Sequence, residues 1–250
     1  MAAGNFDQCL AIVLKHEGGY VDHPRDPGGA TNLGVTIGTL RAWRGRIVTK
    51  AEVRALTFSD VKPIYRKNYW DVVGGDSLTP GVDLAVFDPA VNSGPARAKQ
   101  WYARARNADP VVTVRNICDI RMGFLRALGT WSTFGKGWTR RVADIRARGE
   151  AMARRALGQT PTQVREAATA EAERARADAR KADQKSVAAG GGAAGSSAAV
   201  PVVSLDPAFL AVSAVVVTAL VVLAFYFWHR ERNDLAVKEA YQRVAAEVDA

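Results

Sequence analysis

The sequence predicts a mainly α-helical (α+β) globular domain with a short β-hairpin and loop segment. A helical and flexible linker and a single transmembrane helix follow it. Three observations support this. Apolar residues recur at helical spacing from the N-terminus to about residue 158. Between residues 18 and 38 the chain is instead dense in Gly, Pro, Asp and Asn. Residues 209–228 carry no charge at all.

The first helix is predicted over residues 5–16, with Asn5 as its N-cap. Its apolar face consists of Phe6, Cys9, Leu10, Val13 and Leu14. The segment lacks a basic n-region and a small-residue cleavage site, so we do not interpret it as a signal peptide.

Turns are predicted between residues 18 and 38, with a short hairpin around LGVTIG at residues 33–38. From residue 39 the pattern is mostly helical, and Pro80, Pro95 and Pro110 separate the helices. The predicted segments are 49–56, which begins at a Thr49 cap, 60–70, 82–92, 96–106, 112–128 and 139–157.

Residues 161–208 are predicted to form a linker. Its first part, residues 162–185, is rich in Ala, Glu and Arg and favours a helix, either a stalk or a solvated tether. We expect no coiled coil, because Val164 is the only large apolar residue there and no heptad seam is visible. Residues 186–200 are rich in Gly, Ala and Ser, which is typical of a flexible linker.

Residues 209–228 are long enough to cross a bilayer as one helix. Tyr226 and Trp228 suit the interfacial belt, and Arg230 and Arg232 follow directly. The positive-inside rule then predicts a single-pass inner-membrane protein with a cytoplasmic tail at residues 229–250 and a periplasmic N-terminal domain.

The excess of positive charge lies in the N-terminal part, since residues 1–160 carry 24 Lys and Arg against 14 Asp and Glu. Such a domain attracts polyanions. No zinc-finger spacing or RNP motif accompanies the charge, so we expect no nucleic-acid partner. Cys9 and Cys118 are predicted to be either two buried thiols or, in an oxidising compartment, a single bridge.

Three acidic residues, Glu17, Asp22 and Asp26, lie within ten positions where a helix gives way to a loop. Glycoside hydrolysis uses one carboxylic acid to protonate the leaving oxygen and usually a second carboxylate. His16 and His23 lie nearby but do not form an HExxH arrangement, so we expect neither a metal site nor a cofactor.

The segment EGGYVDHPRDPGGATNLGVT at residues 17–36 resembles the opening motif of glycoside hydrolase family 108. This family comprises lysozyme-like N-acetylmuramidases of phages and bacteria. DLAVFDPAVNSG at 83–94 is similar to its second signature, and FGKGWTRRV at 134–142 to its small peptidoglycan-binding region. The resemblance covers about residues 5–158. It implies a lysozyme-like fold, a catalytic domain at 1–92 and a helical peptidoglycan-binding-like region at 93–160.

The resemblance also implies cleavage of the bond between N-acetylmuramic acid and N-acetylglucosamine, with Glu17 as the general acid. A raised pKa would keep that carboxyl protonated. Phage lysozymes share a pattern in which a Glu is followed after eight residues by an Asp and then after five by a Thr. Glu17 and Asp26 fit it, so Asp26 is the expected second carboxylate or water-positioning group, with Asp22 as the alternative. The Thr position falls on Asn32, one residue after Thr31.

Aromatic rings can stack on sugars, and amides can recognise N-acetyl groups. The substrate-binding candidates are Tyr20, Thr31, Asn32, Tyr69, Trp70 and Asn92. Each aromatic residue at helical spacing is alternatively a core residue, and the same choice applies to Trp101, Trp131 and Trp138.

The expected function is that of a membrane-anchored phage endolysin that degrades peptidoglycan for host lysis, with a holin-type protein as a possible partner. One alternative is a non-catalytic, membrane-anchored protein that binds the cell wall or assists secretion. Another is a lysis factor whose transmembrane helix perturbs the membrane.

Overall fold

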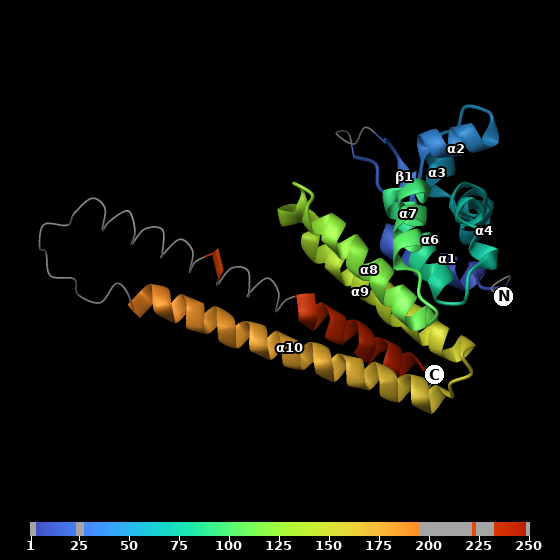
Figure 1. Ribbon diagram of the computed structural model, residues 1–250. Coiled ribbons are helices and arrows are strands. Elements are labelled where there is room, and N and C mark those ends of the chain that lie inside the picture. Colours follow the sequence, from blue (N-terminus) through green and yellow to red (C-terminus); the bar gives the residue numbers. More distant parts are fainter. Residues whose placement is uncertain (1–3, 24–27, 196–221, 224–232, 249–250) are drawn as a thin grey trace, which may run out of the picture. The chain divides into compact units, whose positions relative to one another are not determined.

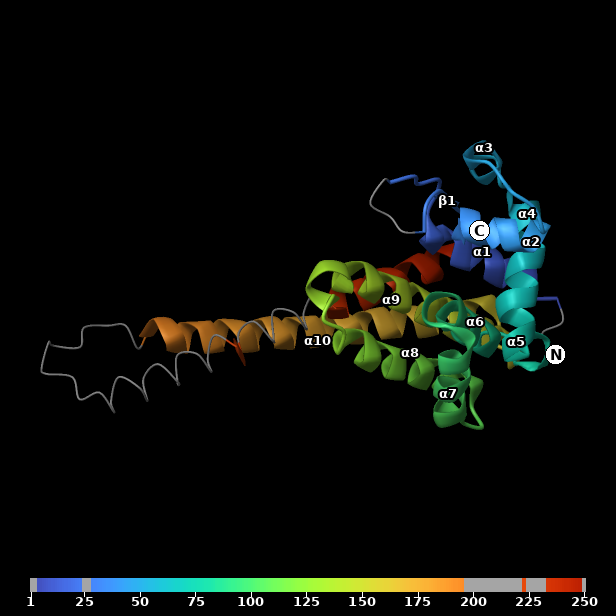
Figure 2. The same ribbon diagram turned by 90° about the horizontal axis from the view of Figure 1, so that it is seen from above.

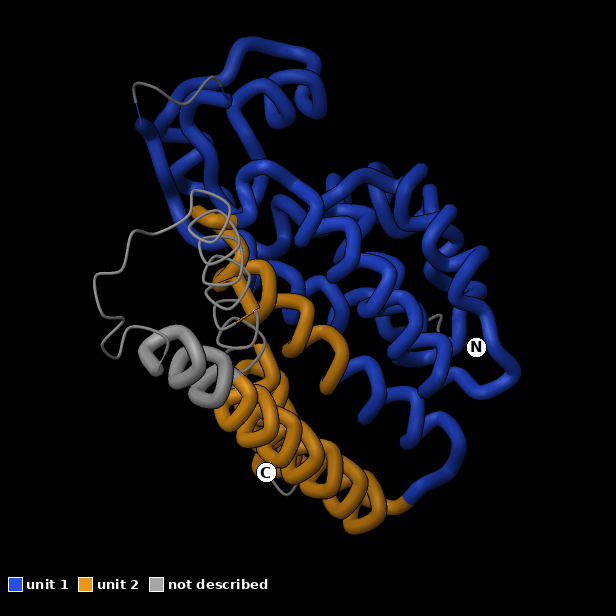
Figure 3. Tube along the Cα trace, turned by 60° about the vertical axis from the view of Figure 1, so that its left-hand side comes forward, with its two compact units in different colours: residues 1–131, 148–159 blue, residues 132–147, 160–250 orange. Residues whose placement is uncertain are grey.

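The structure is a computed structural model that describes residues 4–23, 28–195, 222–223 and 233–248. Within these ranges the chain is mainly helical, as predicted, and carries one two-stranded sheet (Figure 1). Two compact units divide it: residues 1–131 with 148–159, and residues 132–147 with 160–250 (Figure 3). The candidate catalytic residues all belong to the first unit.

Helix α1 (Phe6–Glu17) forms where the periodicity predicts a helix and buries Phe6, Cys9, Leu10, Ile12 and Val13. Asn5 occupies the predicted N-cap position, but its side chain makes no capping hydrogen bond. Its Nδ2 instead donates to Oδ2 of Asp83 at 3.2 Å. This hydrogen bond joins the start of α1 to the buried carboxyl group of Asp83.

The predicted hairpin is present, with β1 (Thr31–Asn32) antiparallel to β2 (Val35–Thr36). Leu33 and Gly34 form its two-residue turn with φ angles of 48° and 72°, the positive values that a type I′ turn requires. The hairpin ends earlier than predicted because Thr36 caps α2 (Ile37–Arg44), accepting a hydrogen bond from Thr39 N at 3.1 Å.

The next two helices also begin at threonine caps. Thr49 and Glu52 form a capping box at α3 (Lys50–Arg54), as Thr57 and Asp60 do at α4 (Phe58–Tyr65). The hydroxyl and amide of Thr57 hold the pKa of Asp60 below its ordinary value. Helix α4 continues into a π-helical turn, η1 (Arg66–Trp70), followed by α5 (Asp71–Val73) and the 3-10 turn η2 (Gly75–Ser77).

Helix α6 (Val82–Ser93) is central to the first unit. Its residues are buried from Val82 to Ala90, because this segment is apolar on nearly every side. It contacts α7 (Pro95–Ala105) and α8 (Pro110–Arg126), which lie beside it in Figure 1. Aromatic rings join it to α1 and η1, with centroids 5.2 Å apart for Phe6 and Trp70 and 5.3 Å for Trp70 and Phe87.

Two carboxyl groups of α6 are buried and hydrogen-bonded. Asp83 accepts from the backbone amides of Gly81 and Leu84, each at 2.7 Å. Burial raises its pKa, and these hydrogen bonds partly oppose the rise. Asp88 forms a buried ion pair with Arg121 of α8. Burying charge is costly unless it is paired, so these contacts fix α6 between its neighbours.

Helix α9 (Trp131–Ala156) meets α6 at a close backbone approach. A β-carbon on Gly81, whose φ is 87°, would lie 2.1 Å from the carbonyl oxygen of Gly149. Only glycine fits this point, where the start of α6 touches the last part of α9.

The two cysteines are buried and form no disulfide. The predicted alternative of a bridge between Cys9 and Cys118 is therefore wrong for this structure. Burial raises the pKa of the Cys9 thiol, and the charge of Asp83 and a hydrogen bond to it raise that pKa further. A thiol held in its protonated form is a poor nucleophile.

The second unit contains the first part of α9, helix α10 (Pro161–Gly195) and a helix at residues 233–247. Figure 2 shows α10 as a long continuous helix. Residues 186–195, predicted as flexible linker, are thus helical. Alanine has the highest helix propensity, and the glycines among these residues weaken the helix without ending it.

Helix α10 also has a seam that its hydropathy pattern does not reveal. Its buried residues recur three and four apart: Val164, Ala168, Ala172, Ala175, Ala179 and Ala182. The sequence prediction considered only large apolar residues and so did not identify this buried face, which consists mostly of alanine. In the same unit, Thr139 Oγ1 of α9 lies 3.0 Å from Asn233 Oδ1, and Arg243 lies 3.8 Å from Asp144.

The predicted transmembrane segment at 209–228 lies outside the described residues, apart from Val222 and Leu223, and so do Arg230 and Arg232. Among the helices of the described ranges, none combines the length and apolar character needed to cross a bilayer. The membrane span therefore stays a prediction from sequence.

Candidate active site

Glu17 is the last residue of α1 and is half-buried against the hairpin turn. A β-carbon built on Gly34 would lie 3.1 Å from Oε2 of Glu17 and 3.2 Å from its Cγ. The carboxyl group therefore rests against the Cα of Gly34. A glycine at this turn serves two purposes, because it permits the positive φ and leaves room for the carboxyl group.

Two tyrosines from α4 and η1 complete the surroundings of Glu17. The Tyr65 hydroxyl donates to the Leu33 carbonyl at 2.9 Å and would lie 2.2 Å from a β-carbon on Gly34. Tyr69 is half-buried, and its ring centroid is 5.5 Å from that of Tyr65. Three elements, α1, the hairpin turn and the α4–η1 helix, thus meet at one carboxyl group.

The electrostatics also place Tyr69 close to Glu17. Burial raises the pKa of the Tyr69 phenol, and the negative charge of Glu17 raises it further. The phenol therefore stays protonated and can donate a hydrogen bond to a carboxylate or to a sugar oxygen. The π-helical turn that carries it adds one residue per turn, a distortion often found at functional sites.

The structure describes one of the two candidate second carboxylates. Asp22 is exposed and its Oδ2 lies 3.0 Å from Nζ of Lys50. It directly follows Val21, whose amide and carbonyl pair with Thr31 at 2.8 Å in both directions. Asp26 lies outside the described residues.

Thr31 is the first residue of β1, and Tyr20 precedes Val21, which pairs with Thr31. The ring of Tyr20 is half-buried, with the Arg54 guanidinium 4.3 Å from its centroid. Thr31 is half-buried and its hydroxyl donates to the Gly29 carbonyl at 3.2 Å. Each keeps part of its surface open to solvent, and their roles in substrate binding stay predictions.

Asn32 and Trp70 are placed in the core and not on a groove. Asn32 is buried, and its Nδ2 donates to the carbonyls of Val53 and Arg54 at 3.1 and 2.9 Å, holding the hairpin to the end of α3. Trp70 is fully buried, and its Nε1 donates to Asp76 Oδ1 at 2.9 Å. We no longer assign either residue to substrate binding.

Asn92 is exposed near the end of α6, and its Oδ1 accepts from Arg121 Nη2 at 3.3 Å. The same arginine makes the buried ion pair with Asp88. The buried Arg121 therefore orients the side chain of Asn92, which is exposed to solvent. This geometry is compatible with an amide that contacts the substrate.

The three tryptophans in the predicted helical region at residues 93–160 differ in exposure. Trp101 is buried, with its ring centroid 5.4 Å from that of Phe124. Trp131 and Trp138 are half-buried, and Trp138 lies 5.7 Å from the exposed Phe134. Trp101 is a core residue, as the alternative interpretation of the sequence held.

Sequence reasoning missed Gly34 and Tyr65. Both carry a usable signal, since an Asn-Leu-Gly run between β-forming residues indicates a tight turn, and Tyr65 precedes Tyr69 by one helical turn. Only the folded structure shows that the turn and the helix meet at Glu17.

A half-buried carboxyl group beside a neutral phenol, on a scaffold fixed by backbone hydrogen bonds, can exchange a proton with a bound substrate. Among the residues that the structure describes, no group of three or more His, Cys, Asp or Glu side chains could hold a metal ion.

Comparison with known proteins supports this interpretation. The sequence profile of Glycosyl hydrolase 108 matches residues 10–94. The chain is also similar to the solved structure of Brucella abortus SagA, with 47% sequence identity and a TM-score of 0.52. The match covers 60% of this chain and 97% of that one. No curated protein matches it.

Proposed function

Because the chain belongs to glycosyl hydrolase family 108, we propose that it is an N-acetylmuramidase that cleaves peptidoglycan between N-acetylmuramic acid and N-acetylglucosamine. The observation that carries this proposal is the position of Glu17. Its carboxyl group lies against the Cα of Gly34, beside the neutral Tyr69, at the edge of the loop where the family's profile matches.

In the proposed mechanism Glu17 donates its proton to the glycosidic oxygen as the bond to the leaving sugar breaks. Tyr69 orients that carboxyl group or the sugar oxygen by donating a hydrogen bond. Asp26 is the proposed second carboxylate, which stabilises the positive charge on the sugar ring or directs water to it. Asp22, already paired with Lys50, is the alternative.

The cellular setting is also proposed from sequence. Residues 209–228 would anchor the enzyme in the inner membrane with its catalytic domain facing the periplasm. Residues 93–160 would help to hold the wall polymer. This arrangement would suit an endolysin that acts together with a holin-type protein.

The test compares the full chain in mild detergent with its Glu17→Gln variant on purified peptidoglycan. Reducing ends and fragment masses are measured, and circular dichroism monitors folding. We expect reducing muramic-acid ends from the wild type and at least a hundredfold fewer from Glu17→Gln, because general acid catalysis contributes about 10²–10⁴-fold.

Asp7→Asn is the matched control. Asp7 is an exposed carboxylate at the opposite end of the same helix, paired with Lys62 at 2.7 Å. It should keep wild-type activity. A folded Glu17→Gln variant that releases fragments at the wild-type rate would exclude Glu17 as the acid. Fragments ending in N-acetylglucosamine would change the bond assigned.

Asp26→Asn and Asp22→Asn then decide which is the second carboxylate. The variant that keeps substrate binding but loses turnover identifies it. For the cellular proposal, expression of the wild type alone should leave cells intact, and co-expression with a membrane-permeabilising holin should lyse them. Rapid lysis by the enzyme alone would contradict the need for such a partner.

A further inference from the structure

The turn between α2 and α3 carries a surface that the proposed mechanism does not use. We call it the α2–α3 surface and define it by Arg41, Trp43, Arg44, Arg46, Ile47 and Lys50. Residues 41–52 contain four cations and one acid, Glu52. Two large apolar side chains lie among these cations, with Ile47 80% exposed and Trp43 38% exposed.

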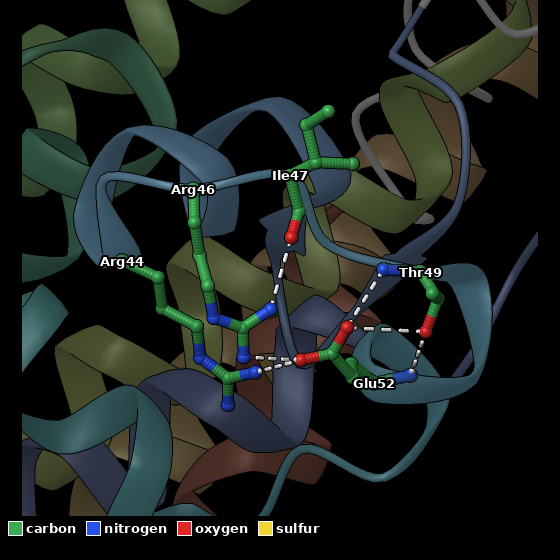
Figure 4. A network of polar contacts seen from close by, with 5 residues as sticks. All are labelled: Arg44, Arg46, Ile47, Thr49 and Glu52. Carbon is green, nitrogen blue, oxygen red and sulfur yellow. Dashed lines mark hydrogen bonds and ion pairs between the residues drawn. The ribbon is translucent and has the colours of Figure 1, made fainter.

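A network of polar contacts joins the residues of this turn. Both Arg44 and Arg46 donate to Oε1 of Glu52, at 2.7 and 2.6 Å, while Oε2 accepts from the Thr49 amide at 2.8 Å (Figure 4). The hydrogen bond from Arg46, followed by that from the Thr49 amide, lowers the pKa of Glu52 to about 2. The acid is therefore charged at any physiological pH and keeps both guanidinium groups in place.

The same network directs Ile47 outward. Arg46 Nη1 donates to the Ile47 carbonyl at 2.9 Å, and the next residue, Val48, is buried. Figure 4 shows the Ile47 side chain pointing away from the polar network. Because the Ile47 side chain is so exposed, it contributes little to the packing of the protein. Its apolar surface is therefore available to a partner.

The ring of Trp43 makes a cation–π contact with a lysine of another element. Nζ of Lys67, on η1, lies 5.6 Å from the centroid of the Trp43 ring. An exposed indole beside an ammonium group, next to a protruding aliphatic side chain with arginines around it, is the combination found where proteins meet a lipid headgroup layer.

We propose that the α2–α3 surface docks on an anionic phospholipid bilayer, with Ile47 inserted among the acyl chains and the arginines among the phosphates. Charge complementarity favours an anionic partner, and the exposed isoleucine distinguishes lipid from a hydrated wall polymer. Such a polymer can engage cations and stack on an indole, but it offers no apolar phase to an aliphatic side chain.

The test uses the full chain with an environment-sensitive fluorophore attached to Ile47→Cys. Cys9 and Cys118 are buried, which protects them from the reagent. Vesicles of phosphatidylglycerol and phosphatidylethanolamine are compared with vesicles of phosphatidylcholine. Residues 209–228 would enter either bilayer, so the comparison isolates the turn. We expect the emission to shift to shorter wavelength on the anionic vesicles, and the shift to fade with added salt.

The control attaches the same fluorophore to Val72→Cys. Val72 is also an exposed aliphatic residue, at 42%, but an acid, Asp71, precedes it. Its emission should not respond to either vesicle. An equal shift at both positions, or an equal shift on neutral and anionic vesicles, would overturn the proposal. So would a shift produced by soluble peptidoglycan fragments and absent on vesicles.

Two charge variants should move the result in opposite directions. Arg41→Gln removes an exposed cation outside the Glu52 network and should reduce the ratio of inserted to free probe about fivefold. Glu52→Gln removes the one acid between residues 41 and 52 and should raise that ratio, since glutamine still completes the capping box with Thr49. No change in either variant would refute the electrostatic part of the proposal.

Discussion

The carboxyl group of Glu17 lies against the Cα of Gly34, so close that a β-carbon there would be 3.1 Å from Oε2. The end of α1 and the hairpin turn are therefore fitted to each other at the proposed catalytic residue. Tyr65 fixes the same turn through its hydrogen bond to the Leu33 carbonyl. Any change at Gly34 must act on the position of Glu17 as well as on the backbone.

We predict that Gly34→Ala abolishes most of the activity on peptidoglycan while leaving a folded protein. The new methyl group would lie 2.2 Å from the Tyr65 hydroxyl oxygen, which must move and release Leu33. Gly45→Ala is the matched control, because its φ of 65° is similar and nothing lies within 4 Å of its β-carbon. Both variants should lose about 1–2 kcal/mol of stability through backbone strain. Gly34→Ala should lose more than Gly45→Ala, because it also breaks the hydrogen bond from Tyr65 to the Leu33 carbonyl. Comparable activity in the two would show that Gly34 is needed for its φ alone.

Replacing Tyr65 should lower stability, whereas replacing Tyr69 should lower turnover. Tyr65→Phe removes a buried hydrogen bond and leaves the Leu33 carbonyl without that donor, so it should lower the free energy of unfolding by about 1–3 kcal/mol. Tyr69→Phe should keep the stability and lower kcat by about tenfold, the effect of roughly 1.4 kcal/mol in the transition state. Urea denaturation and initial rates measure both. The reverse pattern of effects would contradict a structural role for Tyr65 and a catalytic one for Tyr69.

The proximity of Glu17 to Tyr69 predicts a change in the titration of the phenol. The negative charge of Glu17 raises the pKa of Tyr69, so Glu17→Gln should move that pKa downward towards its ordinary value of about 10. NMR of ¹³C-labelled tyrosine rings can follow the titration. Asp7→Asn, which removes an exposed carboxylate at the other end of α1, should leave it unchanged. An unaltered Tyr69 titration in Glu17→Gln would place the two groups farther apart than we infer.

Asn32 is predicted to act on stability and not on substrate affinity. Its amide satisfies the carbonyls of Val53 and Arg54. Asn32→Leu removes this donor, although the Val53 carbonyl still accepts from the Leu56 amide at 3.2 Å. The variant should lose about 1–3 kcal/mol of stability, while KM of the remaining folded enzyme stays unchanged. A rise in KM without loss of stability would restore the sequence-based assignment of Asn32 to the substrate.

Sequence predicted the elements of this fold better than the partners of individual side chains. Helix α1 was placed within one residue at each end, because apolar spacing is a local property. The positions of the Asn5, Asn32 and Trp70 side chains depend on tertiary contacts. The hydrogen-bond partners of Asn5 and Asn32 lie more than 20 residues away in the sequence, so no local sequence pattern predicts them. Glu17 is proposed as the general acid only through the family motif, since Glu17 alone could equally be a surface carboxylate.

The remaining errors have two further causes. The seam of α10 is made of alanine, whose small side chain gives almost no hydropathy contrast between the faces of a helix. A hairpin was predicted around residues 33–38, but its turn lies at Leu33 and Gly34 and its second strand ends at Thr36, because capping by Thr36 starts α2 at once. Threonine suits a strand and a helix cap equally, and the neighbouring hydrogen bonds decide between them.

The buried Asp83 should make stability depend on pH. Burial raises its pKa in the folded protein above that in the unfolded chain, so the folded state binds the proton more tightly. Its contribution to the free energy of unfolding is therefore greatest below the unfolded pKa of about 4 and is lost as pH rises through the raised value. Asp83→Asn keeps an oxygen to accept from Gly81 and Leu84 but cannot ionise.

Urea denaturation of the wild type and Asp83→Asn between pH 3.5 and 8 therefore measures this group alone. The wild type should lose stability relative to the variant as pH increases through this window, and the difference should level off once Asp83 is ionised. Asp7→Asn serves as the exposed control and should show no such trend. A wild type that gains stability relative to Asp83→Asn on the same rise in pH would mean that the hydrogen bonds from Asn5, Gly81 and Leu84 outweigh the cost of burying the charge.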